Sequence, residues 1–415
     1  MKLENIGFYT LNDERAMSAS KDSRLMRCEL ILTDLCNFKC PYCKGLREDC
    51  RGTMDFEKAK RIIDFWAKDN LKSIRLSGGE PTVYRNIIEL VQYIKSKGIE
   101  NIAISTNGSS GFDLYKRLID AGVNDFSVSL DACCSSFGDK MAGGIIGSWD
   151  RVINNIKELA KITYVTLGAV VTEETVGSLK DTIEFCATLG VSDIRIISAA
   201  QYNALLFNAS TVSEEVYEKY PILKYRIENI NAGRNVRGLE ETDSRRCYLA
   251  LDDMAVAGNY HFPCIIYMRE YGDYIGGISK DMRSERARWV KSHDCYNDPI
   301  CKKNCLDVCV DYNNRHLRFQ IKNQNVVAQM DSTNFTYDVW SAGSIHDFGI
   351  KHFRFDNLQE HKRKLLNGIV GYCFGEELPC RPKKNHIALM YEIGDRRFWF
   401  HIRNNEFVEI FVGEK

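Results

Sequence analysis

The chain has 415 residues, of which 44% are hydrophobic and 11% aromatic, enough for one or two buried cores. Lys and Arg together number 56, as do Asp and Glu, so no bulk charge attracts nucleic acid or an acidic membrane surface. The first residues, MKLENIGFYT, hold no apolar signal-peptide core, and no apolar stretch approaches the roughly 20 residues that span a bilayer. We therefore expect a soluble globular protein of the cytoplasm.

The chain is rich in cysteine, with 16 in all. Structural disulfides are rare in the cytoplasm, which keeps thiols reduced, so metal ligation is the stronger interpretation. The cysteines gather in CNFKCPYC (residues 36–43) and in a later group between residues 247 and 309. Isolated ones such as Cys28 and Cys186 are expected to be buried apolar side chains.

Strand-like and helix-like segments alternate through the first half of the chain. Apolar runs predict strands at 28–33, 73–77, 102–106, 126–130, 164–171 and 193–198. Between them apolar residues recur at helical spacing, as from Phe56 to Trp66, where Thr53 is the expected N-cap, and from 87 to 94. This alternation predicts an α/β fold, a parallel sheet or partial barrel with functional residues at the carboxyl ends of the strands.

Two motifs follow the first two predicted strands. Cys36, Cys40 and Cys43 have C-x3-C-x2-C spacing; three thiolates on one loop suit zinc with a distant fourth ligand, and spacing alone leaves zinc open. The second strand ends in RLSGGEP, where Gly78 and Gly79 let the backbone approach a ligand closely and a carboxylate follows at once.

Together these motifs resemble the radical S-adenosylmethionine (SAM) superfamily. The resemblance runs from residue 28 to residue 197 and includes STNG at 105–108 and VSLD at 128–131. It implies a partial (β/α)6 TIM-like barrel in which the three loop cysteines hold a [4Fe–4S] cluster. One iron stays free for the amino and carboxylate groups of SAM, and a fourth thiolate would close that iron.

The same resemblance implies further SAM contacts. The GGEP segment binds the SAM amino group in the family, which implies Gly78 and Gly79 through their backbone and Glu80 through its carboxylate. Tyr42 occupies the aromatic position before the third cysteine and would pack near the adenine. Weaker matches to cofactor-binding positions are Arg75, Thr106, Asn107 and Ser129. Their ordinary alternatives are a surface charge, turn residues and a buried strand hydroxyl.

The later group consists of Cys247, Cys264, Cys295, Cys301, Cys305 and Cys309. Its C-x10-G-x5-C and C-x5-C-x3-C runs resemble the auxiliary-cluster extension called SPASM, or its shorter twitch form, which binds one or two further [4Fe–4S] clusters. Ser292 stands where the full SPASM pattern has a cysteine. The match to the extension is therefore incomplete.

Six thiolates cannot complete two four-iron clusters, which need eight ligands. We therefore expect one auxiliary cluster, held by Cys247, Cys264 and Cys305 with a fourth ligand from the other three cysteines. The alternatives are two clusters, one with an open iron or a ligand such as His293, and a structural zinc site.

The pattern changes beyond the cysteines. HLRFQIKN, IALMYEIGD, RRFWFHIRNN and EFVEIFVGE predict antiparallel strands, and DNLQEHKRKLLNGIVGY predicts one helix among them. Cys373 and Cys380 are expected to be loop thiols without a role. We divide the chain into an N-terminal extension (1–24), the barrel (25–235), the auxiliary-cluster domain (236–312) and a β-rich C-terminal domain for substrate recognition (313–415).

The fourth predicted strand runs into DACCSS, which would bring Asp131, Cys133 and Cys134 to the mouth of the barrel. A thiol there would donate a hydrogen atom to a substrate radical, as in an epimerase, and Asp131 would orient substrate or SAM. Packing beneath the loop and capping of the loop are the alternatives.

The resemblance implies an oxidoreductase, isomerase or peptide maturase that forms a 5′-deoxyadenosyl radical from SAM and removes a hydrogen atom from a small molecule or peptide. Flavodoxin or ferredoxin would supply the electron. Cys36 lies near the start of the chain, so we expect no leader-peptide-binding domain before the barrel.

This expectation favours a small molecule or nucleotide as substrate. One alternative is a ribosomal-peptide maturase with a separate leader-binding partner. The other, of a different class, is an iron–sulfur or zinc scaffold or an electron carrier, which RLSGGEP disfavours.

Overall fold

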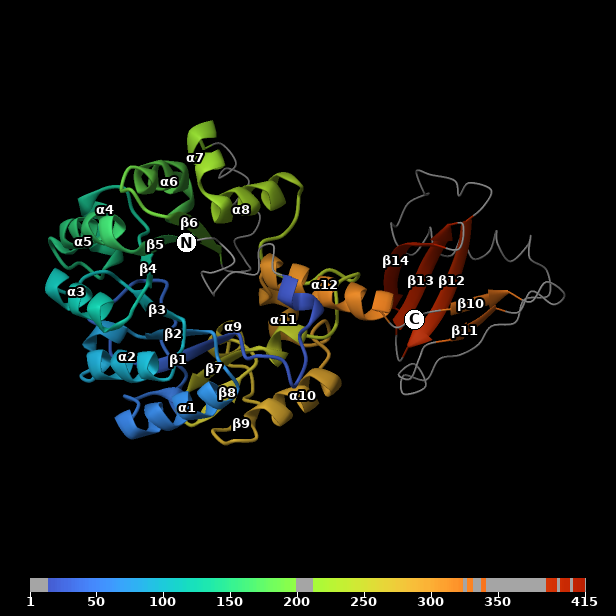
Figure 1. Ribbon diagram of the computed structural model, residues 1–415. Coiled ribbons are helices and arrows are strands. Elements are labelled where there is room, and N and C mark those ends of the chain that lie inside the picture. Colours follow the sequence, from blue (N-terminus) through green and yellow to red (C-terminus); the bar gives the residue numbers. More distant parts are fainter. Residues whose placement is uncertain are drawn as a thin grey trace. The chain divides into compact units, whose positions relative to one another are not determined.

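The computed structural model describes residues 14–198 and 212–323 together with five later strands (Figure 1). The chain divides into two compact units. The first combines residues 1–239 with 246–312, and the second combines residues 240–245 with 313–415. Within the described residues, every helix is too short or too polar to cross a membrane.

A sheet forms the centre of the first unit, and its first six strands are parallel and adjacent in chain order. They are β1 (Arg27–Thr33), β2 (Ser73–Gly78), β3 (Asn101–Thr106), β4 (Asp125–Ser129), β5 (Tyr164–Val171) and β6 (Asp193–Ser198). On the other side of β1 lie β7 (Asp253–Ala257), β8 (Tyr260–Phe262) and β9 (Gly276–Gly277). The six predicted strands are confirmed, each within one residue of its predicted bounds.

Helices connect the parallel strands along the outer side of their arc (Figure 1). They are α1 (Phe56–Lys68), α2 (Ile87–Ser96), α3 (Phe112–Ala121), α4 (Ser135–Met141), α5 (Ser148–Ile162) and α6 (Leu179–Ala187). Their apolar faces pack with the strands into one core, because an amphipathic helix must bury its apolar stripe. Cys28 and Cys186 lie in this core, as predicted. The architecture is the predicted α/β fold, a partial TIM-like barrel.

The predicted N-cap of α1 is wrong. Asp55 caps the helix, since its side chain accepts a hydrogen bond from the backbone N–H of Lys58 at 2.9 Å. The hydroxyl of Thr53 lies instead 2.9 Å from that of Thr33, at the end of β1. Thr53 therefore connects to the end of β1, and the N-cap lies two residues later than predicted.

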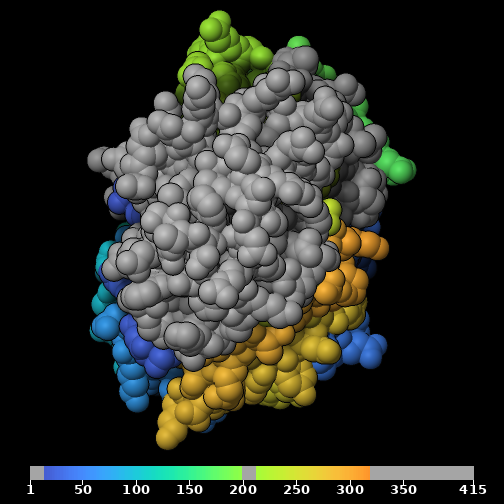
Figure 2. Space-filling model, turned by 90° about the vertical axis from the view of Figure 1, so that its right-hand side faces the viewer, coloured from blue at the N-terminus to red at the C-terminus, as the bar shows by residue number. Residues whose placement is uncertain are grey.

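The cysteine-rich segment of the first unit is mostly helical. It contains α9 (Ile265–Arg269), α10 (Met282–Ser292), α11 (Pro299–Asn304) and the start of α12 (Asp307–Asn323). Figure 2 shows the yellow-to-orange residues, which include α10 and α11, as one continuous part of the surface. The strand predicted from HLRFQIKN is wrong, because these residues continue α12. Val308, Tyr312 and His316 are buried at a spacing of four, which is helical.

The second unit is rich in β-structure. Its strands are β10 (Val327–Met330), β11 (Tyr337–Trp340), β12 (His386–Ile393), β13 (Arg396–Arg403) and β14 (Glu406–Glu414). β12, β13 and β14 form an antiparallel sheet, which confirms the last three predicted strands. The helix predicted at 356–372, Cys373 and Cys380 lie outside the described residues.

Asp193 provides a test of the packing behind β6. Its side chain is 1% exposed and accepts hydrogen bonds from the backbone N–H groups of Ile194 at 2.8 Å and Ile222 at 3.2 Å. The second bond holds the start of α8 (Pro221–Asn231) beside the strand. Burial raises the pKa of Asp193 to about 7.

We expect the Asp193→Asn variant to gain stability relative to wild type as the pH rises from about 4 to 7. The pKa of Asp193 in the folded chain lies above the value near 4 of an unfolded chain. The folded state therefore binds the extra proton in this range, and wild type loses stability as that proton dissociates. Urea unfolding at a series of pH values measures the effect. Asp181→Asn, at an exposed position of α6, is the control. A pH-independent difference for Asp193→Asn would contradict the interpretation.

Candidate active site and metal centre

The predicted cysteine loop follows β1 at the carboxyl edge of the sheet. Cys36 and Cys43 are exposed and Cys40 is half-buried. Backbone N–H groups of Phe38 and Gly45 donate to the sulfurs of Cys36 and Cys43, each at 3.4 Å. Such donors stabilise thiolates, so this donor set fits three ligands of an iron–sulfur cluster.

The three thiols of the loop are close enough to influence one another electrostatically. Burial raises the pKa of Cys40 most, and together with the negative charges of Asp131, Cys43 and Cys36 it brings the value to about 12. A thiolate at this position is therefore favoured only with a positive charge such as a metal ion beside it.

The two glycines of GGEP pack against the start of the cysteine loop. A Cβ on Gly78 would lie 2.4 Å from the carbonyl oxygen of Thr33, and a Cβ on Gly79 would lie 2.3 Å from that of Leu35. The backbone N–H of Gly79 donates to Thr33 at 2.7 Å, and that of Glu80 donates to Leu35 at 2.8 Å. The glycines therefore permit a close approach between two segments of the chain.

The carboxylate of Glu80 joins the ends of β2 and β3. It is 1% exposed and accepts four hydrogen bonds, from the N–H and hydroxyl of Thr82, the hydroxyl of Thr106 and the N–H of Asn107, at 2.7–3.1 Å. We expected this carboxylate to bind the amino group of SAM. In the structure both of its oxygens accept bonds from the chain itself, and its contact with SAM stays a prediction.

Asn107 connects the end of β3 with the cysteine loop. Its side-chain nitrogen donates to Asn37 at 2.8 Å and lies 3.9 Å from the sulfur of Cys36. Asn37 in turn donates to the hydroxyl of Ser109 at 2.8 Å. Sequence analysis missed Asn37, and its place between two loop cysteines was the available signal.

Tyr42 lies beside a small pocket at the carboxyl ends of the strands. The pocket is lined in part by Phe38, Cys40, Tyr42, Asn107, Ser129 and Trp149. The hydroxyl of Tyr42 donates to Asp131, whose other oxygen accepts from the N–H of Val170 at 2.6 Å. Asp131 also lines the pocket and is buried, and burial raises its pKa to about 6. Phe38 and Trp149 were missed by sequence analysis.

The other predicted substrate and cofactor residues lie in different surroundings. Cys133 is half-buried and Cys134 is exposed. Neither is among the described residues that line the pocket. Arg75 is buried on β2 close to Asp125. The pKa of Asp125 is about 6, because burial raises it by more than the charge of Arg75 lowers it. Of the three predicted catalytic residues, only Asp131 is brought to the pocket.

The six cysteines of the later group come together in the first unit. Cys264 caps α9, accepting from the N–H of Tyr267 at 3.4 Å. Burial raises the pKa of Cys305, and nearby Cys309, Cys247, Cys295 and Cys264 raise it further. Cys301 belongs to the same group, because nearby Cys295, Cys264 and Cys305 raise its pKa.

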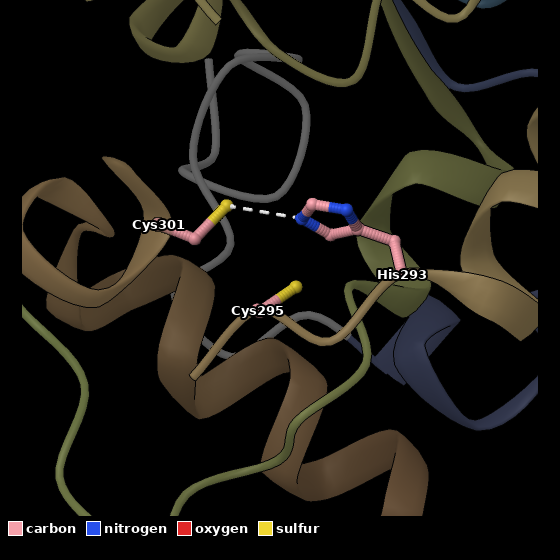
Figure 3. A group of neighbouring side chains, drawn as sticks. All are labelled: His293, Cys295 and Cys301. Atoms are coloured by element: carbon pink, nitrogen blue, oxygen red, sulfur yellow. Dashed lines mark hydrogen bonds between the residues drawn. The ribbon is translucent and has the colours of Figure 1, made fainter. Parts of the chain in front are cut away.

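Two of these cysteines and a histidine lie especially close together. The Nε2 atom of His293 and the sulfurs of Cys295 and Cys301 all lie within 4.8 Å of one another. Figure 3 shows the imidazole of His293 and the two thiols directed toward a common point. His293 Nε2 is 4.0 Å from the sulfur of Cys301 and 3.5 Å from Oδ2 of Asp298.

Arg286 holds the chain around Cys264. Its side chain on α10 is fully buried and donates to the backbone carbonyls of Ala250, Phe262 and Pro263 at 2.7–3.1 Å. These carbonyls come from the turn before β7 and from the residues that lead into Cys264. One guanidinium therefore fixes two segments of the cysteine-rich part.

Comparison with known proteins bears on the cysteine loop and the barrel. Residues 30–186 match the family described as the Radical SAM superfamily. The probable GTP 3′,8-cyclase of Methanocaldococcus jannaschii is 30% identical over 196 residues, 45% of this chain and 65% of that protein. That of Sulfurisphaera tokodaii is 28% identical over 169 residues, 40% of this chain and 53% of that protein. The chain thus spans less than two thirds of these relatives.

Two solved structures are also similar to this chain. Streptococcus suis SuiB bound to S-adenosylmethionine has a TM-score of 0.46 and 16% identity, over 68% of this chain and 72% of that chain. Native anSMEcpe with bound AdoMet and the Kp18Cys peptide has a TM-score of 0.49 and 14% identity, over 71% of this chain and 97% of that chain.

We expect Gly79→Ala to lower the free energy of unfolding by about 1–3 kcal/mol, because its Cβ would meet the Leu35 carbonyl oxygen at 2.3 Å. Gly177→Ala is the matched control, since among the described residues no atom beyond its chain neighbours lies within 4 Å of an added Cβ. Urea unfolding of both variants is the measurement. Equal stability would contradict the close packing of GGEP on the cysteine loop.

We expect Arg286→Met to lower the free energy of unfolding by at least about 3 kcal/mol, because several buried carbonyls lose their donor at about 1–3 kcal/mol each. Arg288→Met, at an exposed position of the same helix, should change it little. Urea unfolding compares the two variants. A loss below about 1 kcal/mol for Arg286→Met would mean that the carbonyls find other donors.

Proposed function

We propose that this chain, whose residues 30–186 match the Radical SAM superfamily, cleaves SAM reductively and removes a hydrogen atom from a small molecule or a peptide. The observation that carries the proposal is the cysteine loop at the carboxyl end of β1. Its three thiols lie near one another, and backbone donors face two of the sulfurs.

Cys36, Cys40 and Cys43 would hold the [4Fe–4S] cluster, with one iron left for SAM. When bound, the reduced cluster and SAM supply a 5′-deoxyadenosyl radical. The chain's own contribution is to orient the loop. Asn107 approaches Cys36 from β3, and Gly79 fixes the backbone at Thr33.

The pocket beside Tyr42 supports an adenosyl site. Its lining combines the aromatic rings of Phe38, Tyr42 and Trp149 with the hydroxyl of Ser129. Aromatic faces and a few polar groups are typical of small-molecule pockets. The bond from Tyr42 to Asp131 would hold the ring in place, so we assign Asp131 to positioning Tyr42.

An auxiliary [4Fe–4S] cluster would occupy the later group of cysteines. Cys247 and Cys309 pack against the same small apolar cluster, which includes Leu249 and Tyr312. This shared neighbourhood favours Cys309 as the fourth ligand beside Cys247, Cys264 and Cys305. A fully ligated cluster there would pass electrons rather than bind substrate.

The relatives from Methanocaldococcus jannaschii and Sulfurisphaera tokodaii suggest which substrate to test first. Both are probable GTP 3′,8-cyclases, so GTP is the first small molecule to test. A precursor peptide is the second, with a separate protein that recognises its leader. Flavodoxin or ferredoxin would be the electron donor in either case.

We expect anaerobically reconstituted wild type to contain about eight irons and to release 5′-deoxyadenosine from SAM with dithionite. The triple variant Cys36→Ala/Cys40→Ala/Cys43→Ala should lose about four irons and nearly all 5′-deoxyadenosine formation while keeping its fold. Iron and sulfide analysis, circular dichroism and product chromatography measure these quantities.

Cys50→Ser is the matched control for this experiment. Cys50 is buried outside both groups, and its thiol lies 3.7 Å from the carbonyl of Ala257, a contact that a serine hydroxyl can keep. It should retain wild-type iron and SAM cleavage. An iron-replete wild type that never cleaves SAM would overturn the proposed function.

A further inference from the structure

His293, Cys295 and Cys301 form a metal-binding group separate from the cysteine loop. Their ligand atoms lie within 4.8 Å of one another, and the Nε2 to sulfur distance from His293 to Cys301 is 4.0 Å. We propose that these three side chains bind one Zn²⁺ ion that links the end of α10 to the start of α11. The inference goes beyond the proposed function and does not depend on it.

The spacing favours a single ion over a four-iron cluster. Zinc binds sulfur at about 2.3 Å and nitrogen at about 2.0–2.1 Å in a tetrahedron, so ligand atoms on one ion lie about 3.5–4 Å apart. In a four-iron cluster each cysteine binds a different iron, which requires wider separation. The 4.0 Å separation of Nε2 and the Cys301 sulfur matches ligands that share one ion.

The imidazole of His293 is held in the orientation that a ligand needs. The ring of Trp289 stacks on it with centroids 4.1 Å apart and an angle of 17° between planes. The ring of Tyr267 meets it edge-on at 5.9 Å and 90°. These contacts direct Nε2 toward the sulfurs (Figure 3), and the rigid ring lowers the entropy that binding would cost.

Asp298, the N-cap residue of α11, supports the same site. One of its carboxylate oxygens accepts from the N–H groups of Ile300 and Cys301, each at 2.8 Å, and so fixes the backbone that carries the Cys301 thiol. The other oxygen accepts from the hydroxyl of Tyr267 at 2.8 Å and lies 3.5 Å from Nε2 of His293. This carboxylate adds negative charge beside three N and S donors, a setting that suits Zn²⁺.

The proposal also separates the later cysteines into two sets. Cys295 and Cys301 would belong to zinc, and the other four cysteines would form a complete ligand set for one [4Fe–4S] cluster. Seven ligands would then serve two centres without an unligated iron. His293 would then be a zinc ligand and would not complete a second iron–sulfur cluster.

The test counts zinc and iron separately in full-length protein produced anaerobically, and adds Co²⁺ to protein freed of zinc. We expect about one zinc per chain and, with Co²⁺, visible absorption from a tetrahedral site with nitrogen and sulfur ligands. His293→Ala, His293→Gln and Cys301→Ser should each weaken Zn²⁺ binding at least about tenfold and leave iron content unchanged. Cys50→Ser, with its thiol outside the group, should keep both metals.

The outcomes distinguish the two proposals. Loss of about four irons in the His293 variants, with no zinc in wild type, would overturn the zinc site and make His293 a cluster ligand. Wild type without zinc and without a Co²⁺ spectrum would also overturn it. The cysteine-loop triple variant should keep its zinc, so failure of SAM cleavage with zinc present would affect only the proposed function.

Discussion

The buried carboxylate of Glu80 is the interaction on which the rest of the candidate site depends. A carboxylate with 1% exposure is tolerated only where donors replace its water. Thr82, Thr106 and Asn107 supply those donors. Because they come from the ends of two strands, satisfying this one charge requires the two strand ends to stay together. Burial raises the pKa of Glu80, and the same donors oppose that rise.

The cysteine loop takes its position from this pair of strand ends. Backbone bonds run from Gly79 to Thr33 and from Glu80 to Leu35, and the missing side chain of Gly79 makes the approach sterically possible. Asn107 reaches the loop from the third strand. The thiols therefore stand on a loop held by three strands, which is how a fixed scaffold positions reactive groups.

The cysteine-rich segment uses buried polar side chains in the same way. Arg286 donates to carbonyls that flank Cys264, and Asp298 accepts from the N–H of Cys301. In both places a charged side chain satisfies backbone groups and thereby fixes a cysteine. Short helices benefit from such bonds, because propensity alone does not hold them.

The sequence by itself determined the strands of the barrel, the strands β12 to β14 and the two cysteine groups, because apolar periodicity and ligand spacing are local properties. It misplaced the N-cap of α1 and the segment after Tyr312, where Thr53 is drawn to Thr33 and α12 continues through an alternating pattern. Only the tertiary structure decided that Glu80 bonds to Thr106 and Asn107. It also decided that His293 meets Cys301. Such partners depend on where separate loops converge, and no local pattern along the chain encodes that geometry.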